Sequence, residues 1–209
     1  MEGYEVDYWP SSNSKDVKWV LENYEKPSQF VNAHRKLTVP AEEKLILIAV
    51  KSDYKMHVIR NGKRDTTYEI ALSQDPIGHK QRQGDNRLPE GEYKIIEKSR
   101  GPFSGDYSDY FGTGWMRINY PNAFDAEAGC RNGLISTEQK EKIIAAIKAD
   151  REPPKTTKLG GGIGIHGWSG DWTADGTQNL TWGCISMHNE DMKTFQDLIP
   201  VPVKIIILP

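Results

Sequence analysis

The chain has 209 residues, of which 37% are hydrophobic and 27% charged, with 29 acidic side chains against 27 basic ones. This size predicts one main domain with a core of its own. The near balance of charge provides no broad basic face for nucleic acid. No apolar run approaches the roughly 20 residues of a transmembrane segment. The first residues lack the basic and apolar regions of a signal peptide, so the chain is either intracellular or a mature exported form.

The first part of the chain predicts helices. Apolar residues recur at helical spacing from Val17 to Tyr24, after Ser14 as a candidate cap, and a second short helix is expected over Phe30 to Lys36. We therefore expect residues 1–43 to form an N-terminal helical appendage and residues 44–209 to form the main domain.

From Leu45 onward the pattern predicts mainly strands. Asn61-Gly62 between two alternating runs is a strong signal for a type I′ hairpin. Ser136 with Gln139 forms a capping box for one helix, and a second helix is expected over Asn189 to Ile199. The other expected strands are "LILIAV", "EYKIIE", "WMRINY", "IGIH" and "VPVKIIIL". The predicted fold class is mainly β with peripheral helices.

Cys184 and His166 are the candidate chemical pair. A nucleophilic cysteine needs a thiolate, and an adjacent base can provide it. His166 stands at the end of a strand beside Gly167, whose carbonyl can orient the imidazole, and Gly183 allows close approach of the backbone to a substrate. The alternative is a buried core histidine and an inert buried cysteine. The second cysteine, Cys130, has no base nearby in sequence, so we expect Cys184 to be the more reactive thiol.

Other chemistries fit less well. The "GWSGD" around Ser169 lacks the last glycine of a nucleophile elbow. Cys184 and His188 lack a second Cys/His pair at zinc spacing, so no metal site is predicted.

Two segments resemble the active-site signature of the YkuD-type L,D-transpeptidases. They are "IHG", which contains His166, and "TWGCISMHNEDM", which begins after the fourteen residues that follow His166. "PIGHKQRQGDNRLPEGEYKI" resembles the family's loop and strand before the site. "INYPNAFD" resembles a segment of the branch that includes enzymes releasing a lipoprotein from peptidoglycan. The resemblance covers about Lys44 to Leu208.

The resemblance implies a β-sandwich of mixed sheets without metal or organic cofactor. Residues 101–159 are long enough to form an inserted helical and loop lid on it, and we expect them to do so. It makes Cys184 the nucleophile, His166 its general base and Gly167 the carbonyl that orients the histidine. Thr181 matches the family's hydroxyl position and Gly183 the glycine before the nucleophile. The chain departs from the pattern at Trp182, where the family usually has histidine, and at Ser186, where it usually has arginine.

The implied substrate is the peptidoglycan stem peptide, attacked at the L-centre of diaminopimelate and passed as a thioester to an amine or to water. The outcome would be transpeptidation, an L,D-carboxypeptidase or endopeptidase reaction, or release of a peptidoglycan-linked lipoprotein, in a periplasmic or otherwise extracytoplasmic location. The rivals are a non-catalytic peptidoglycan-binding domain and a thiol hydrolase of L,L-peptides. Candidate substrate contacts are Trp168, Trp172, Trp182, His79 and Arg87, whereas for Lys80 we favour a solvated turn.

Overall fold

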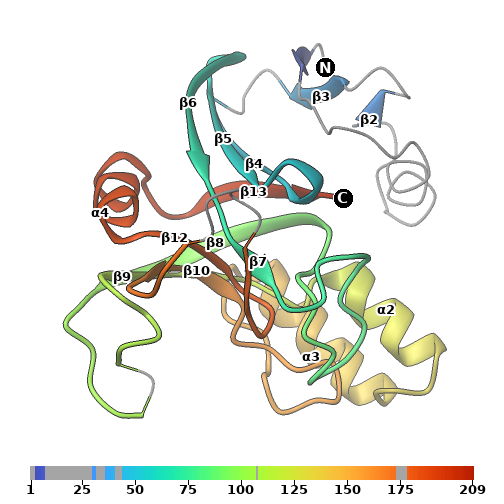
Figure 1. Cartoon of the computed structure of the whole chain (residues 1–209). Helices are drawn as coiled ribbons and strands as arrows, with labels where there is room; N and C mark the ends of the chain where they lie inside the picture. Colours follow the sequence, from blue (N-terminus) through green and yellow to red (C-terminus); the bar gives the residue numbers. More distant parts are fainter. Residues whose placement is uncertain (1–2, 8–29, 32–35, 41–43, 107, 173–177) are drawn as a thin grey trace.

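The structure is a computed structural model that describes residues 3–7, 30–31, 36–40, 44–106, 108–172 and 178–209. Its centre is an eight-stranded mixed sheet in the order β12-β10-β9-β8-β13-β4-β5-β6 (Figure 1). The strands are β4 (Leu45–Val50), β5 (Lys55–Arg60), β6 (Lys63–Glu69), β8 (Gly91–Arg100), β9 (Gly114–Ile118), β10 (Gly164–Trp168), β12 (Ile185–His188) and β13 (Val203–Leu208). Two short strands, β7 (Leu72–Ser73) and β11 (Asn179–Thr181), pair in parallel beside it.

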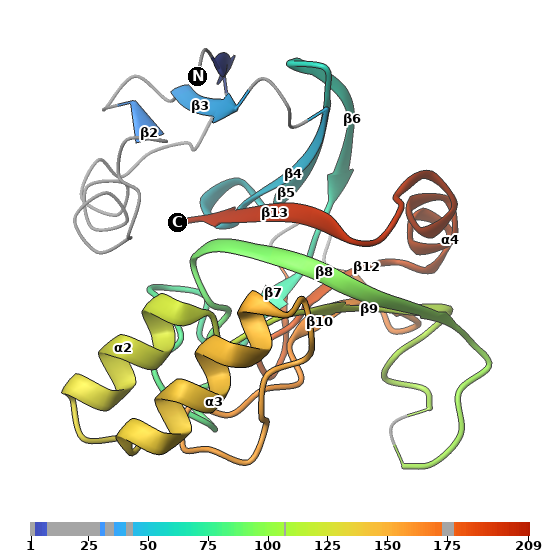
Figure 2. The same cartoon turned by 180° about the vertical axis from the view of Figure 1, so that it is seen from behind.

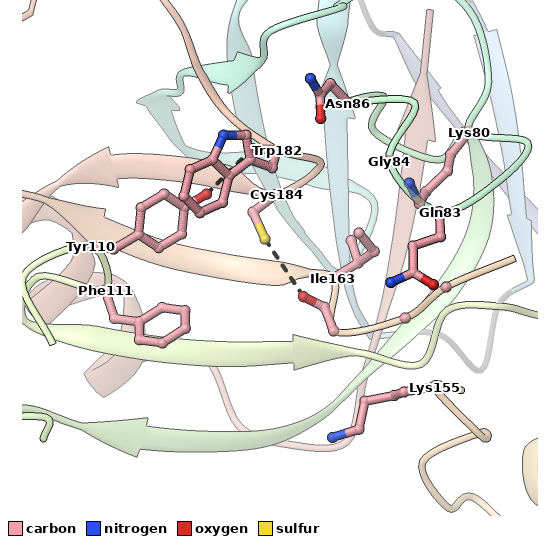
Figure 3. A pocket seen from close by; sticks show the side chains of 13 residues that line it. Lys80, Gln83, Gly84, Asn86, Tyr110, Phe111, Lys155, Ile163, Trp182 and Cys184 are labelled. Carbon is pink, nitrogen blue, oxygen red and sulfur yellow. Dashed lines mark hydrogen bonds between the residues drawn. The ribbon is translucent and has the colours of Figure 1, made fainter. Parts of the chain in front are cut away.

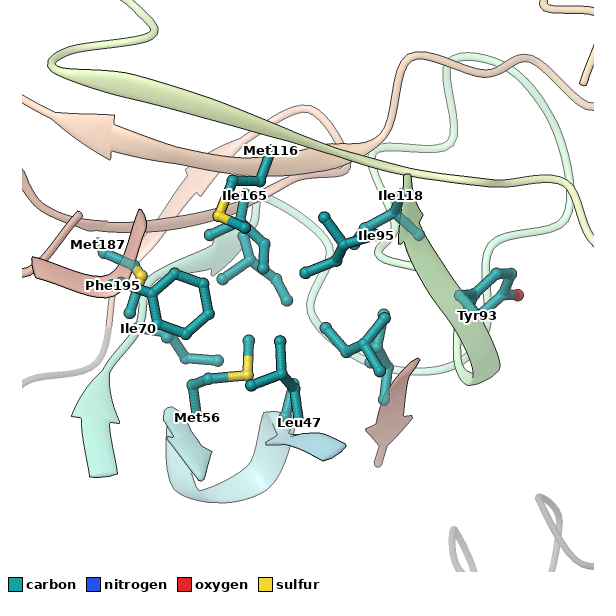
Figure 4. Close-up of a cluster of buried hydrophobic side chains, with 14 of the residues drawn as sticks. Leu47, Met56, Ile70, Tyr93, Ile95, Met116, Ile118, Ile165, Met187 and Phe195 are labelled. Carbon is teal, nitrogen blue, oxygen red and sulfur yellow. The ribbon is translucent and has the colours of Figure 1, made fainter. Parts of the chain in front are cut away.

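The sheet curls around one apolar core. Leu47 and Met56 on β4 and β5 approach Met116 and Ile165 on β9 and β10 from the other side of the same cluster (Figure 4). Helix α4 (Asn189–Leu198) contributes Phe195, which is fully buried. The mainly β fold class with a mixed sheet and few helices is confirmed.

Local sequence signals place two of the elements as expected. The β5–β6 hairpin turns at Asn61 (φ 49°) and Gly62 (φ 75°), which is the positive-φ pair that a type I′ turn requires. Helix α3 (Thr137–Lys148) begins with the expected capping box, in which Ser136 Oγ accepts from Gln139 N and Gln139 Oε1 accepts from Ser136 N.

The N-terminal expectation needs correction. The described parts of residues 1–43 form a three-stranded antiparallel sheet of β1 (Gly3–Asp7), β2 (Phe30–Val31) and β3 (Lys36–Pro40). The helix expected over Phe30 to Lys36 is therefore wrong at both of its ends, because cross-strand pairing outweighs a short helical pattern. The helix expected at Val17 to Tyr24 lies outside the described residues.

Part of residues 101–159, the range expected to form an inserted lid, lies in the central sheet. Strand β9 lies in this range, yet it pairs with β8 on one side and β10 on the other, so it belongs to the central sheet. The rest is a loop before β9 and a pair of helices after it. Helix α2 (Ala123–Arg131), which the sequence pattern did not reveal, packs beside α3 below the sheet (Figure 2). Among the described helices, none combines the length and apolar character needed to cross a bilayer.

Candidate active site

The strand register brings the two candidate residues to the same face of the sheet. Strands β10 and β12 run parallel with Ile165 opposite Ile185 and His166 opposite Ser186. Successive side chains in a strand point to opposite faces. Ile165 and Ile185 enter the core, so His166 lies on the other face. Cys184 lies directly before β12 and two residues before Ser186, so the same alternation, continued by one residue, puts it on the face of His166.

His166 is held as a neutral imidazole with one nitrogen available. The ring is fully buried, and Nδ1 lies 2.7 Å from the carbonyl oxygen of Gly167. A carbonyl can only accept, so Nδ1 carries the proton and Nε2 has a lone pair. Burial lowers the pKa of His166 to about 4, opposed by the main chain of Gly167 and Tyr110. Among the described residues Nε2 has no hydrogen-bond partner. The imidazole can therefore accept a proton at Nε2.

Aromatic side chains cover His166. The ring of Tyr110 lies 4.5 Å from the imidazole, between centroids, and those of Phe111 and Trp115 lie 5.8 Å and 6.3 Å away. Tyr110 also stacks on Trp182 at 5.1 Å, with the two rings nearly parallel. Tyr110 and Phe111 were not among the residues predicted from the sequence. Their only signal was the aromatic content of "DYFGTGW" in a loop that is distant in sequence from His166.

The loop that carries Tyr110 and Phe111 is held in place by hydrogen bonds at its end, next to β9. Thr113 N donates to Asn189 Oδ1 at 3.0 Å, and Thr113 Oγ1 donates to Asn189 O at 2.9 Å. Helix α4 starts at Asn189, so the end of the loop is fixed to the first residue of that helix.

Cys184 is a protonated thiol in this arrangement. Its side chain is 7% exposed, and Sγ donates to the carbonyl oxygen of Gly162 at 3.7 Å (Figure 3). Burial raises the pKa of the Cys184 thiol to about 11, opposed by the main chain of Gly164 and the charges of Lys80 and Arg117. The thiol therefore points to Gly162 rather than to His166, and its burial does not support our expectation that it is the more reactive of the two thiols.

The turn before Cys184 explains two of the residue types in the motif. Thr181 Oγ1 donates to the carbonyl oxygen of Cys184 at 2.6 Å and accepts from Gly183 N at 3.4 Å. Gly183 has φ +145°, and a Cβ there would lie 3.0 Å from Ile163 Cδ1 and 3.2 Å from Arg87 O. Only glycine fits this position without strain. Thr181 and Gly183 thus shape the turn that presents Cys184.

Cys184 lines a cavity of about 580 Å³ that has two chemically different sides. Tyr110, Phe111 and Trp182 lie on one side of the thiol, and Lys80, Gln83 and Lys155 lie on the other (Figure 3). The remaining lining residues are Gly84, Asn86, Gly160, Gly161, Gly162 and Ile163. The cavity can therefore hold a ligand with one polar end beside the sulfur.

The tryptophans expected near the substrate are divided by the fold. Trp182 is 54% exposed and lines the cavity. Trp168 is not among the lining residues and meets Tyr110 edge-on at 5.9 Å between centroids. Trp172 stacks on His188 at 3.8 Å and is also absent from the lining.

The polar candidates also need correction. His79 is buried, with Nδ1 accepting from Glu90 N at 3.0 Å and Nε2 lying 3.0 Å from Asp125 Oδ1. Arg87 donates through Nε to Asp75 Oδ2 at 2.8 Å. Neither lines the cavity, because each side chain is held by a carboxylate elsewhere. Lys80, expected in a solvated turn, is instead 4% exposed and lines the cavity.

The "INYPNAFD" segment serves the fold in this chain. Asn119 Oδ1 accepts from Lys94 N, and the Tyr120 hydroxyl donates to Leu159 O. Asn122 forms the capping box of α2 with Asp125, which also accepts from the hydroxyl of Tyr93. These contacts fasten α2 to the sheet.

Comparisons with known proteins agree with the motif. The family model described as the L,D-transpeptidase catalytic domain YkuD matches residues 43–207. Similar solved structures include the helical cell shape determining protein Pgp2 from Campylobacter jejuni (20% identity, TM-score 0.53) and Bd1075 from Bdellovibrio bacteriovorus (21% identity, TM-score 0.51). Each alignment covers 79% of this chain and 48% of the other, so the chain spans about half the length of these proteins. At this identity the likeness shows the fold. No curated protein matches the chain. The match over residues 43–207 and the shared fold place this chain in the YkuD family of L,D-transpeptidase catalytic domains.

Proposed function

We propose that this chain is a cysteine-dependent enzyme that acts on peptidoglycan stem peptides through a thioester at Cys184. The family acts on peptidoglycan. The observation that supports the assignment to these residues is the strand register, which pairs His166 with Ser186 directly after Cys184 has led into β12. Among the described residues, Nε2 of His166 also has no hydrogen-bond partner. A binding domain would need neither a thiol in the cavity nor an open imidazole nitrogen.

The reaction begins with a change in the direction of the thiol. Sγ leaves the carbonyl of Gly162 and turns toward His166, whose Nε2 takes its proton. The sulfur forms a bond to the carbonyl carbon at the L-centre of diaminopimelate, the carbon–nitrogen bond to the D-residue breaks, and Nε2–H protonates the departing amine. Because the pKa values of the two groups favour the neutral pair at rest, the proton moves as the sulfur attacks rather than before.

Gly167 acts in this scheme as a positioning residue. Its carbonyl holds the proton on Nδ1 and so leaves Nε2 as the reacting nitrogen. The backbone amide of Cys184 is the candidate donor to the oxyanion, because the constrained turn sets its direction before substrate arrives. The amide of Gly183, the second donor expected from the motif, would first have to leave its 3.4 Å hydrogen bond to Thr181 Oγ1.

The second half of the reaction transfers the acyl group to an amine or to water. The aromatic cover of Tyr110, Phe111 and Trp182 restricts access of water to this face of the sheet, which favours an amine acceptor. Hydrolysis is the alternative outcome of the same thioester. The family assignment also supports an extracytoplasmic location. Release of a lipoprotein rests only on the "INYPNAFD" resemblance, whose residues hold the fold here.

The test incubates the protein with stem tetrapeptides that end in diaminopimelate–D-Ala and follows the products and the intact protein by mass spectrometry. We expect an acyl adduct on Cys184 and loss of D-Ala, with an added amine or water as acceptor. Cys184→Ala should form neither. The same peptides ending in L-Ala should not react. Equal rates on the two epimers, or turnover by Cys184→Ala, would refute the proposal.

A further inference from the structure

The polar side of the cavity is positively charged. Lys80 and Lys155 line it, and among the described lining residues there is no Asp or Glu side chain. Lys155 is 49% exposed and pairs with Glu152 at 3.1 Å, so solvent screens it. Lys80 is buried, and a buried charge acts strongly on a neighbouring ligand.

Lys80 is held with its charge only partly compensated. Its Nζ donates to Asp85 Oδ1 at 2.7 Å and to the carbonyl oxygen of Arg82 at 3.1 Å. Asp85 in turn accepts from three backbone amides, those of Gln81, Arg82 and Arg87. The negative charge of Asp85 is thus shared among four donors. An ammonium group has three N–H bonds, and in the described part of the chain Lys80 uses two of them.

The ammonium also lies beside the reacting turn. A Cβ on Gly183 would be 3.9 Å from Lys80 Nζ, and Gly183 directly precedes the nucleophile. Figure 3 shows Lys80 on the side of Cys184 away from the aromatic rings. A group bound by the third N–H would therefore sit next to the bond that is broken.

We propose that Lys80 is a specificity-determining residue that binds a carboxylate of the stem peptide adjacent to the scissile bond. The inference rests on the proposed function. Two carboxylates meet this description, the terminal one of the D-residue and the one on the side chain of diaminopimelate. The α-carboxylate of the preceding glutamate is farther along the peptide and serves as an internal control.

Binding to the Cys184→Ala protein, measured by calorimetry, tests this without any chemistry. The probes are the tetrapeptide and three analogues, with a terminal carboxamide, with lysine in place of diaminopimelate, and with the α-carboxylate of glutamate amidated. A hydrogen bond between charged groups contributes enough that its loss should weaken binding about tenfold or more. We expect this tenfold weakening for either the carboxamide or the lysine analogue, and the analogue that shows it identifies the bound carboxylate. The analogue with amidated glutamate should bind almost as well as the tetrapeptide.

Lys80→Met in the same background should remove the preference, since it keeps the length of the side chain and loses the charge. Lys155→Met is the matched control and should leave the preference in place. If Lys80→Met fails to fold, the comparison of the tetrapeptide with its three analogues on the Cys184→Ala protein still tests the proposal.

Equal binding of the tetrapeptide and all its analogues overturns the role of Lys80 and leaves the proposed function intact. If the tetrapeptide does not bind at all, the substrate class is wrong and both proposals fall. If Cys184→Ala prefers the tetrapeptide to its analogues but the wild-type protein shows no turnover, the carboxylate site is upheld and the proposed reaction is refuted.

Discussion

The neutral state of His166 predicts a specific loss of stability in acid. In the unfolded chain the imidazole titrates near its ordinary value of 6.5, whereas in the folded chain its pKa is lowered to about 4. Between these values the unfolded state binds the extra proton, so the free energy of unfolding falls as the pH falls. At pH 4.5 this costs roughly 2.5 kcal/mol relative to pH 7.5. The stability is fully present above 6.5.

The assay is urea unfolding of wild type and His166→Asn at both pH values. Asparagine keeps an amide N–H for the carbonyl of Gly167 but cannot gain a proton in this range. The variant should lose its packing against Tyr110 at every pH, so the informative quantity is the change between the two pH values. That change should be smaller than in wild type by roughly 2.5 kcal/mol.

His57 provides a matched control. It is 5% exposed, and its pKa is also lowered to about 4, mainly by burial, yet it lies on β5, and its Nδ1 is 2.9 Å from Thr67 Oγ1. His57→Asn should reduce the acid loss by a similar amount and retain turnover. If His166→Asn showed the same acid loss as wild type, His166 would titrate normally in the folded protein and our account of the neutral base would be wrong.

Three further predictions follow from the region around Cys184. The free energy of unfolding of Cys184→Ala should lie within about 1 kcal/mol of the wild-type value, because only one weak hydrogen bond is removed. The variant should lose all turnover, because the nucleophile is gone. Thermal melts and the peptide assay measure the two effects, and residual turnover would contradict the prediction. Gly183→Ala should lower the free energy of unfolding by about 2 kcal/mol or more, since φ at this position is +145° and the new Cβ would press on Ile163. Urea unfolding measures this change, and an unchanged free energy would mean that the turn relaxes to accept the Cβ. Limiting iodoacetamide at pH 7 should label the half-buried Cys130 before Cys184. The rate at which Cys184 is labelled should rise as the pH approaches 11, and peptide mapping measures both rates. Rapid labelling of Cys184 at pH 7 would contradict this, because it would indicate a thiolate at rest.

Much of the fold was predictable because its signals are local. The hairpin at Asn61-Gly62 follows from two positive-φ positions in adjacent residues, and the start of α3 follows from the reciprocal bonds of Ser136 and Gln139. Helix α2 was missed because its cap, Asn122, lies in a segment that also reads as the end of a strand. Strand β1 was missed because its partner β3 is about thirty or more residues away in sequence. Strand β2, which pairs with the nearby β3, was missed because its apolar residues were assigned to a short helical pattern.

The sequence by itself determined the family and the identity of the candidate pair, since the spacing of "IHG" and "TWGC" is a property of the linear chain. Only the tertiary structure decided which polar residues reach the cavity. His79 is drawn to Asp125, whereas Lys80, its neighbour in sequence, is clamped by Asp85 beside the nucleophile. The direction of the thiol and the cover of Tyr110 were likewise decided by contacts between separate segments. Burial and charge pairing depend on such contacts, and for that reason a linear pattern does not reveal them.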